Sequence, residues 1–189
     1  MGGPGSFSGL RIGFSIAKGM ALALGIPFAS IPTLDCISFP LQTSNFPVMP
    51  VISARKNAFF YAVYRNGESI YPSQNIAADA SIEQICDFFR SEGANFCSEK
   101  LLLTGYSAEL LYNELKEQLP HGSNSFIELF HEKRGFAREL LAIAINDNVF
   151  DNLSVDYLEG PCYIRKTDAE MALKMDGGEI KKESADFAD

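Results

Sequence analysis

Several residue types and motifs that common chemistries need are scarce or missing from this sequence. It contains no tryptophan and only two histidines, which lie ten residues apart and form neither an HxxxH nor an HExxH pattern. Zinc sites usually draw ligands from such spacings, so we predict no metal site and no metal-dependent catalysis. The four cysteines form no CxxC pair and are typical of reduced thiols in a cytoplasmic protein. These are Cys36, Cys86, Cys97 and Cys162.

The balance of charge and hydropathy excludes further classes. The 189 residues include 16 Lys and Arg against 24 Asp and Glu, a net charge of −8. Nucleic-acid grooves need clustered cations, so no direct nucleic-acid groove is expected. No apolar run approaches the ~18 residues of a membrane span, and no start resembles a signal peptide, so we expect no membrane contact. With 47% hydrophobic residues, the chain can bury the core of one large domain or two small ones.

The chain opens on a glycine-rich turn followed by a long helix. Ser6 is a good N-cap, Gly25 is a typical left-handed stop, and Pro27 cannot continue the helix. We therefore predict a helix over residues 7–24, capped at Ser6. The turn nearly matches a GxGxxG loop but is one residue too long, and it lacks the Gly-Lys-Ser/Thr of a Walker A loop. Backbone N–H groups around Gly3, Gly5 and Ser6 are an anion-site candidate, the alternative being a turn kept tight for packing.

This helix has two apolar faces. At 100° per residue, one stripe faces the core, and it consists of Leu10, Phe14, Ala17, Ala21 and Leu24. The opposite side carries small and apolar residues where an exposed helix back is normally charged, namely Ile12, Ile16, Gly19 and Ala23. Gly19 costs ~1 kcal/mol against alanine, which close approach of another helix would explain. Such a helix must pack on two sides, the second against its own fold or against another molecule.

The rest of the chain alternates strand and helix patterns. Apolar segments predict strands at residues 26–31, 48–54, 58–64, 69–76, 100–104 and 125–130, with Asn66-Gly67 as a type I′ hairpin turn. Thr33, Ser81 and Ser107 are expected to cap helices, and a further helix is predicted over 135–150. From residue 48 the order is β-β-β-α-β-α-β-α, which indicates an α/β fold with a ribonuclease-H-like layout and parallel additions to the sheet. Residues 40–47 are predicted to be a linker, and residues 175–189 a disordered tail.

Three segments carry a resemblance to a known family. GGPGSFSGLRIGFSIAKGMALALGIPF resembles the signature GPGSFTGLRIG…AKGLALALGIP of the TsaB (YeaZ) family. ISARKNAFFYAVY resembles the strand pair of that family, and GPCYIR resembles its closing P-x-Y-x-R strap. Ser8 stands where threonine is usual, and Ser53 stands where the family usually has aspartate.

The resemblance implies a two-lobed ASKHA (actin/Hsp70-like) fold with ribonuclease-H-like lobes. Residues 1–40, with the interface helix at 6–24, are then an incomplete first lobe, and residues 48–168 are the second lobe. The family's opening strands and first helix are not in this sequence, which leads us to expect truncation at an internal methionine or a fragmented gene.

The resemblance also implies a function. Family members are non-catalytic dimerisation or scaffold subunits that bind a TsaD-like catalytic subunit for threonylcarbamoylation of adenosine 37 in tRNA (t6A). It implies a TsaE-like ATPase or a second copy as further partners, and ATP or ADP only at the partner interface. No catalytic residue is implied. The expected partner interface consists of Arg11, Ile12, Ser15, Ile16, Gly19 and Ala23.

Two other functions stay open. One is an enzyme, either an ASKHA-type kinase or a peptidase-like homologue, which would need a phosphate-binding loop and a carboxylate base that the sequence does not display. The other is a truncated fragment with no function.

Overall fold

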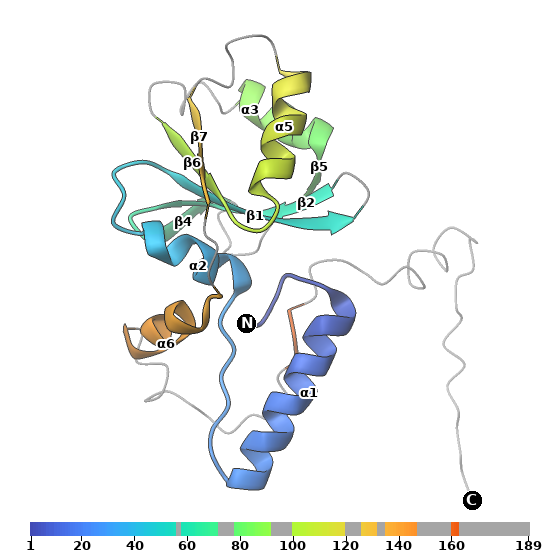
Figure 1. Cartoon of the computed structure of the whole chain (residues 1–189), viewed down its shortest axis with the longest axis vertical. Helices are drawn as coiled ribbons and strands as arrows, with labels where there is room; N and C mark the ends of the chain where they lie inside the picture. Colours follow the sequence, from blue (N-terminus) through green and yellow to red (C-terminus); the bar gives the residue numbers. More distant parts are fainter. Residues whose placement is uncertain are drawn as a thin grey trace, which may run out of the picture.

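A mixed β-sheet forms the centre of the molecule (Figure 1). The structure, a computed structural model, describes residues 1–55, 58–71, 78–91, 100–119, 126–131, 135–146 and 160–162. Within these residues the sheet has seven strands: β1 (Val48–Arg55), β2 (Ala58–Tyr61), β3 (Val63–Arg65), β4 (Glu68–Tyr71), β5 (Ala78–Ser81), β6 (Leu101–Thr104) and β7 (Ile127–Phe130).

Strand β1 occupies the middle of the sheet and has different partners along its two edges. Antiparallel β2 and β3 lie along one edge, with Ile52 opposite Phe60 and Val48 opposite Tyr64. Parallel β6 lies along the other edge, where Val48 is also opposite Leu102, and β7 adds parallel to β6. The predicted parallel additions are therefore confirmed. The α/β fold class predicted from the sequence is confirmed as well, because helices pack on a mixed sheet.

The predicted second strand differs from the observed one. Residues 58–64 were expected to form a single strand, but Ala62 separates β2 from β3. The separation allows β2 to pair with β5 and β3 to pair with β4, so one bent segment carries two outer strands. Strand β5 was not predicted. The hairpin turn between β3 and β4 is confirmed, because Asn66 and Gly67 both have positive φ, 53° and 83°, as a type I′ turn requires.

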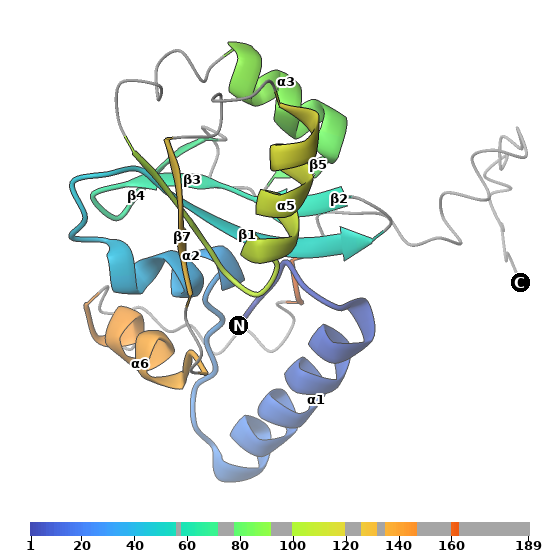
Figure 2. The same ribbon diagram turned by 45° about the horizontal axis from the view of Figure 1, so that its top comes forward.

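Helices cover both faces of the sheet (Figure 2). One face packs against α3 (Ile82–Ser91) and α5 (Ala108–Gln118), and the other against α2 (Thr33–Ser38), the 3-10 turn η1 (Phe39–Leu41) and α6 (Ala137–Asn146). The alternation of side chains along the bent strand explains the two cores: Phe59 and Tyr61 belong to the first, whereas Phe60 and Tyr64 belong to the second.

The helix caps expected at Thr33, Ser81 and Ser107 have different outcomes. Ser81 and Gln84 form a reciprocal capping box at α3, with Ser81 N–H donating to Gln84 Oε1 at 2.9 Å. Ser107 occupies the N-cap position of α5, as predicted, but its hydroxyl makes no capping bond and instead accepts from Ser53 N–H at 2.8 Å. Thr33 is the first helical residue rather than a cap, since Pro32 precedes α2 at the N-cap position.

The N-terminal helix has the predicted bounds. Helix α1 spans Phe7–Leu24, Gly9 N–H donates to Ser6 Oγ at 3.4 Å, and Gly25 ends it with φ 63°. The strand predicted at residues 26–31 is absent, because this stretch forms no ladder with the described parts of the chain, although Ile31 O accepts a backbone bond from Gly2 N–H. The predicted tail at 175–189, the end of the strand predicted at 69–76 and the end of the helix predicted at 135–150 lie outside the described residues.

Helix α1 also corrects the expectation about membrane-length segments. Among the described residues it is the one helix long and apolar enough to cross a membrane, with 18 residues of mean hydropathy 1.2. Helix α1 is not an uninterrupted apolar run, because it contains Arg11 and Lys18. A helix that packs in a soluble protein passes the same test, so length and composition alone do not place α1 in a membrane.

Candidate functional site

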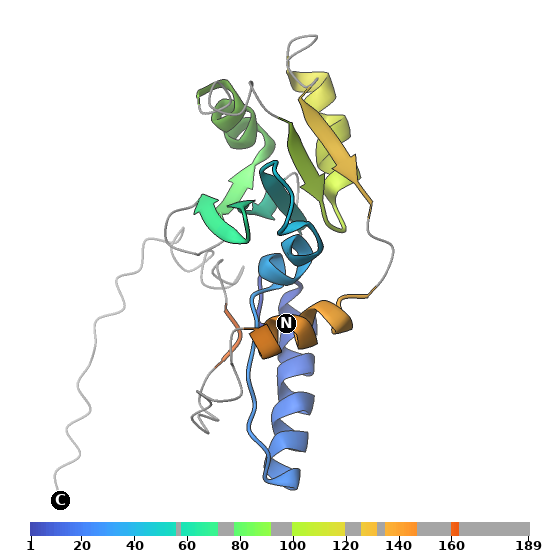
Figure 3. The same cartoon turned by 90° about the vertical axis from the view of Figure 1, so that its left-hand side faces the viewer.

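Helix α1 projects away from the sheet and its covering helices (Figure 3). Its inner side is held by a small aromatic cluster in which the Phe14 ring packs edge-on to the Phe28 ring, with centroids 5.4 Å apart. Lys18 Nζ lies over both rings, 5.7 Å from the Phe28 centroid. Phe14 and Ala21 are the two buried residues of the helix. The inner face of α1 is therefore covered along a narrow strip only.

The opposite side of α1 is apolar and exposed. Ile12, Ile16 and Met20 are 62%, 58% and 59% exposed, and the two small residues beside them are also exposed. A Cβ atom added at Gly19 would meet nothing within 4 Å, so this chain does not supply the close neighbour that would explain the glycine. We call this surface the α1 outer face, and it consists of Ile12, Ile16, Gly19, Met20 and Ala23.

The structure extends the predicted set at one position and corrects it at another. Met20 was missed, although it lies 40° from Ile16 on the helical wheel and a wider stripe would have included it. Leu24, predicted to face the core, is 65% exposed. The last turn of the helix reaches beyond the aromatic cluster, and Ile26, which follows it, is also exposed.

A basic residue borders the α1 outer face. The Arg11 guanidinium lies 4.5 Å above the centroid of the Phe7 ring, a cation–π contact that orients it along the helix surface. Ser15, the other polar residue predicted here, is exposed. Helix α1 contains no acidic residue. An apolar stripe with a cation beside it is chemically suited to a helix or groove that combines apolar side chains with a carboxylate.

The glycine-rich turn joins three segments of the chain. Gly2 N–H donates to Ile31 O at 2.7 Å, Thr33 N–H donates to Gly3 O at 2.8 Å, and Cys162 N–H donates to Gly2 O at 2.8 Å. A Cβ atom at Gly3, where φ is +110°, would lie 2.5 Å from the carbonyl oxygen of Cys162. Close backbone approach therefore accounts for Gly3 by packing alone, while Gly5 is half-buried and Ser6 caps α1.

The remaining residues considered for chemistry are not brought together. Cys36 and Cys86 are buried and Cys162 is exposed, and none of these three forms a disulfide. Burial raises the pKa of the Cys36 thiol to about 12, which suits an inert core residue rather than a nucleophile. Within the described ranges no three His, Cys, Asp or Glu side chains are placed to hold a metal ion.

Comparison with known proteins places this chain in a family. The family model described as TsaD, tRNA N6-adenosine threonylcarbamoyltransferase, matches residues 2–159. Over 78 residues the chain is 32% identical to the tRNA threonylcarbamoyladenosine biosynthesis protein TsaB of Bacillus subtilis, covering 39% of this chain and 34% of that protein. Over 69 residues it is 36% identical to the protein of the same name from Escherichia coli, covering 35% and 30%. The matches thus span about a third of these relatives.

Two solved structures share the fold. One, an uncharacterized protein with similarity to peptidase YEAZ from Pseudomonas aeruginosa, superposes with a TM-score of 0.62 at 20% identity, covering 86% of this chain and 70% of that one. The other, YeaZ from Pseudomonas aeruginosa, gives a TM-score of 0.60 at 19% identity with the same coverage. At these identities the likeness concerns the fold.

Proposed function

Because this chain belongs to the TsaD family, as one of its TsaB (YeaZ) members, we propose that it acts in the biosynthesis of threonylcarbamoyladenosine in tRNA. In this proposal it is a non-catalytic cytoplasmic subunit that docks on a TsaD-like catalytic subunit. The names of the relatives from Bacillus subtilis and Escherichia coli support the pathway, and the α1 outer face supports the means of docking.

The exposure of the α1 outer face is the observation that carries the docking proposal. Apolar area removed from water contributes about 25 cal/mol per Å², and an uncovered stripe of this kind is a cost that a partner relieves. Gly19 allows a facing helix to approach to the shorter end of the usual ~8–10 Å between axes. A stable interface buries about 800 Å² on each partner, so surfaces beside the stripe must contribute as well.

We assign the transfer chemistry to the catalytic subunit and the docking surface to this chain. In this proposal the catalytic subunit supplies the transfer chemistry, and the described part of this chain contains no group of three His, Cys, Asp or Glu side chains placed to hold a metal ion. ATP or ADP, if the complex uses it, binds where the two subunits meet. A second copy of this chain and a TsaE-like ATPase are the alternative partners for the same complex.

Co-purification of the full chain with a tagged TsaD-like subunit tests the proposal. Ile16→Asp places a charge in the stripe and Gly19→Leu blocks close approach, so both are expected to abolish recovery of the complex. Ile145→Asp on α6 is the matched control, since Ile145 is also 58% exposed but lies outside the α1 outer face. It is expected to bind like the unmodified chain.

The outcomes separate the alternatives. Unchanged recovery with both α1 variants would contradict docking through this face. Light scattering that shows a dimer of the chain alone, lost in Ile16→Asp, would instead assign the face to self-association. Sustained ATP or peptide hydrolysis by the chain alone would contradict the non-catalytic role.

A further inference from the structure

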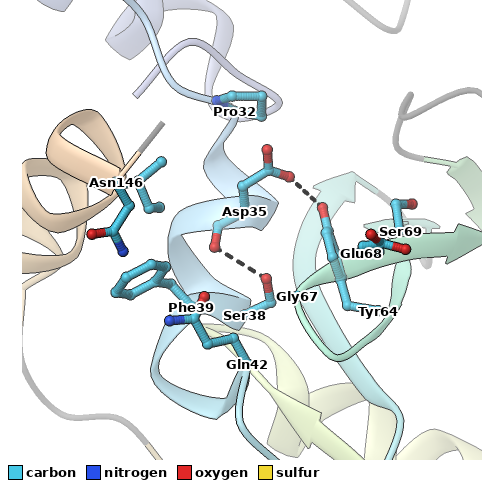
Figure 4. Close-up of a pocket in the computed structure, with 11 residues that line it drawn as sticks. Pro32, Asp35, Ser38, Phe39, Gln42, Tyr64, Gly67, Glu68, Ser69 and Asn146 are labelled. Atoms are coloured by element: carbon cyan, nitrogen blue, oxygen red, sulfur yellow. Dashed lines mark hydrogen bonds between the residues drawn. The ribbon is translucent and has the colours of Figure 1, made fainter. Parts of the chain in front are cut away.

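A cavity of 590 Å³ lies on the sheet face that carries α2 and α6 (Figure 4). It is bounded by α2, η1, the β3–β4 hairpin and the end of α6, and its lining includes Asp35, Gln42, Tyr64, Glu68 and Asn146. Ligand sites for small molecules typically measure about 300–1,000 Å³, so this cavity is large enough to hold one. None of its lining residues belongs to the α1 outer face.

The lining has one sign of charge. Asp35 and Glu68 contribute two carboxylates, and no lysine, arginine or histidine is among the lining residues. The amides of Gln42 and Asn146 contribute two carbonyl oxygens as further acceptors. A concave surface lined by charges of one sign concentrates the field and attracts the opposite charge. The cavity is therefore electrostatically suited to a cation.

One of the two carboxylates is held in place. The Tyr64 hydroxyl donates to Asp35 Oδ1 at 2.5 Å, and Ser38 Oγ donates to the Asp35 main-chain carbonyl at 3.0 Å (Figure 4). Burial, followed by the charge of Asp35, raises the pKa of Tyr64 above its usual value of 10, so the phenol stays protonated and remains the donor. The side chain of Asp35 is thus oriented before any ligand arrives.

The second carboxylate, that of Glu68, is not held in place by a hydrogen bond to its side chain from any described residue. Glu68 begins β4 opposite Arg65 in the hairpin. Its side chain is exposed and forms no ion pair or hydrogen bond within the described part of the chain. On the opposite wall, Phe39 and Ile143 present apolar surface. The cavity consequently combines a fixed carboxylate, a free one and an apolar wall.

We propose that this cavity binds a small organic cation with a primary ammonium group on a short apolar chain. An ammonium offers three donors for the carboxylate of Glu68 and the side-chain carbonyls around it, while the charge of Asp35 favours it over a neutral ligand. The apolar chain packs against Phe39 and Ile143. The inference is independent of the proposed docking of α1.

NMR titration of the full chain with 1,4-diaminobutane tests the proposal, and 1,4-butanediol serves as the uncharged ligand of the same length. We expect saturable shifts at cavity residues with the diamine and none with the diol. Glu68→Gln is expected to weaken binding at least tenfold. Asn146→Arg should abolish it, because it places a fixed cation at the cavity, and arginine is well tolerated at a helix C-terminus.

The control is Glu109→Gln, which removes an exposed carboxylate on α5, on the other face of the sheet, and should bind like the unmodified chain. A lack of saturation, equal binding of the diol, or equal weakening by Glu109→Gln and Glu68→Gln would overturn the proposal. Equal weakening by the two substitutions would mean that the diamine binds through the overall negative charge of the chain and not in the cavity. Co-purification with the catalytic subunit is scored separately, so the two proposals fail independently.

Discussion

The hydroxyl of Tyr64 donates a 2.5 Å hydrogen bond to Asp35 across 29 positions of sequence. The bond joins β3 to α2, and both residues lie beside a shared core that contains Leu34, Ile37 and Phe60. It therefore fastens the segment after α1 to the sheet with a polar contact, in addition to apolar packing.

Replacing this phenol should measurably destabilise the chain. Tyr64→Phe keeps the ring but removes the donor, so the free energy of unfolding should fall by about 1–2 kcal/mol. Urea denaturation measures the change. Tyr112→Phe is the control, because Tyr112 is half-buried and its hydroxyl forms no hydrogen bond in the described part of the chain. Equal effects of the two substitutions would show that the Tyr64 bond adds nothing.

The stability that the Tyr64–Asp35 pair contributes should depend on pH. The folded state raises the pKa of Tyr64 above 10, so its stabilisation is complete below about pH 10 and is lost as the pH rises further. Tyr64→Phe should therefore lose less stability than the unmodified chain between pH 9 and about pH 11. Parallel pH profiles would contradict this assignment.

The glycine-rich turn provides a third prediction. Gly3→Ala should destabilise the chain by about 2 kcal/mol or more, because the new Cβ would lie 2.5 Å from a main-chain oxygen at a positive φ. Gly5→Ala is the matched control, since its nearest neighbours are side-chain atoms of Leu10 at 3.8–4.0 Å. It should change the free energy of unfolding by less than about 0.5 kcal/mol. Thermal and urea unfolding compare the two, and similar stabilities would exclude tight packing as the reason for Gly3.

The reactivity of the cysteine thiols provides a fourth prediction. Cys36 is fully buried and burial raises its pKa to about 12, so at pH 8 only about one molecule in ten thousand carries the reactive thiolate. Burial also raises the pKa of Cys86. Iodoacetamide should label the exposed Cys162 in the native chain, and the two buried thiols only in denaturant, as read by peptide mass spectrometry. Native labelling of Cys36 as fast as Cys162 would contradict the placement of α2 against the sheet.

Local signals were sufficient at the two ends of α1 and at the β3–β4 hairpin, where the structure depends on neighbouring residues. Ser6 and Gly25 set the ends of α1, and Asn66-Gly67 set the hairpin turn, because caps and tight turns are formed by residues a few positions apart. The strand expected at residues 26–31 failed for the opposite reason. An apolar run becomes a strand only if another strand lies beside it, and the sequence does not state where its partners are.

Contacts between segments that are distant in the chain could not be predicted from the sequence. Ser107 is the N-cap residue of α5, as predicted, but its hydroxyl bonds to Ser53, 54 positions away. The separation of β2 from β3 depends on which outer strand pairs with each. The cavity beside Asp35 was also missed, because Tyr64, Glu68 and Asn146 approach it from three different elements. No residue spacing in the sequence indicates that these three residues line one cavity.

The amino-acid sequence by itself determined the family, through one long motif and two shorter ones, and the position and two-sided apolar character of α1. Only the tertiary structure decided which side of that helix is covered. Periodicity records where apolar side chains lie around an axis, whereas burial depends on which other segments reach them. In this molecule Phe28 reaches Phe14, while Ile12 and Ile16 remain exposed to solvent.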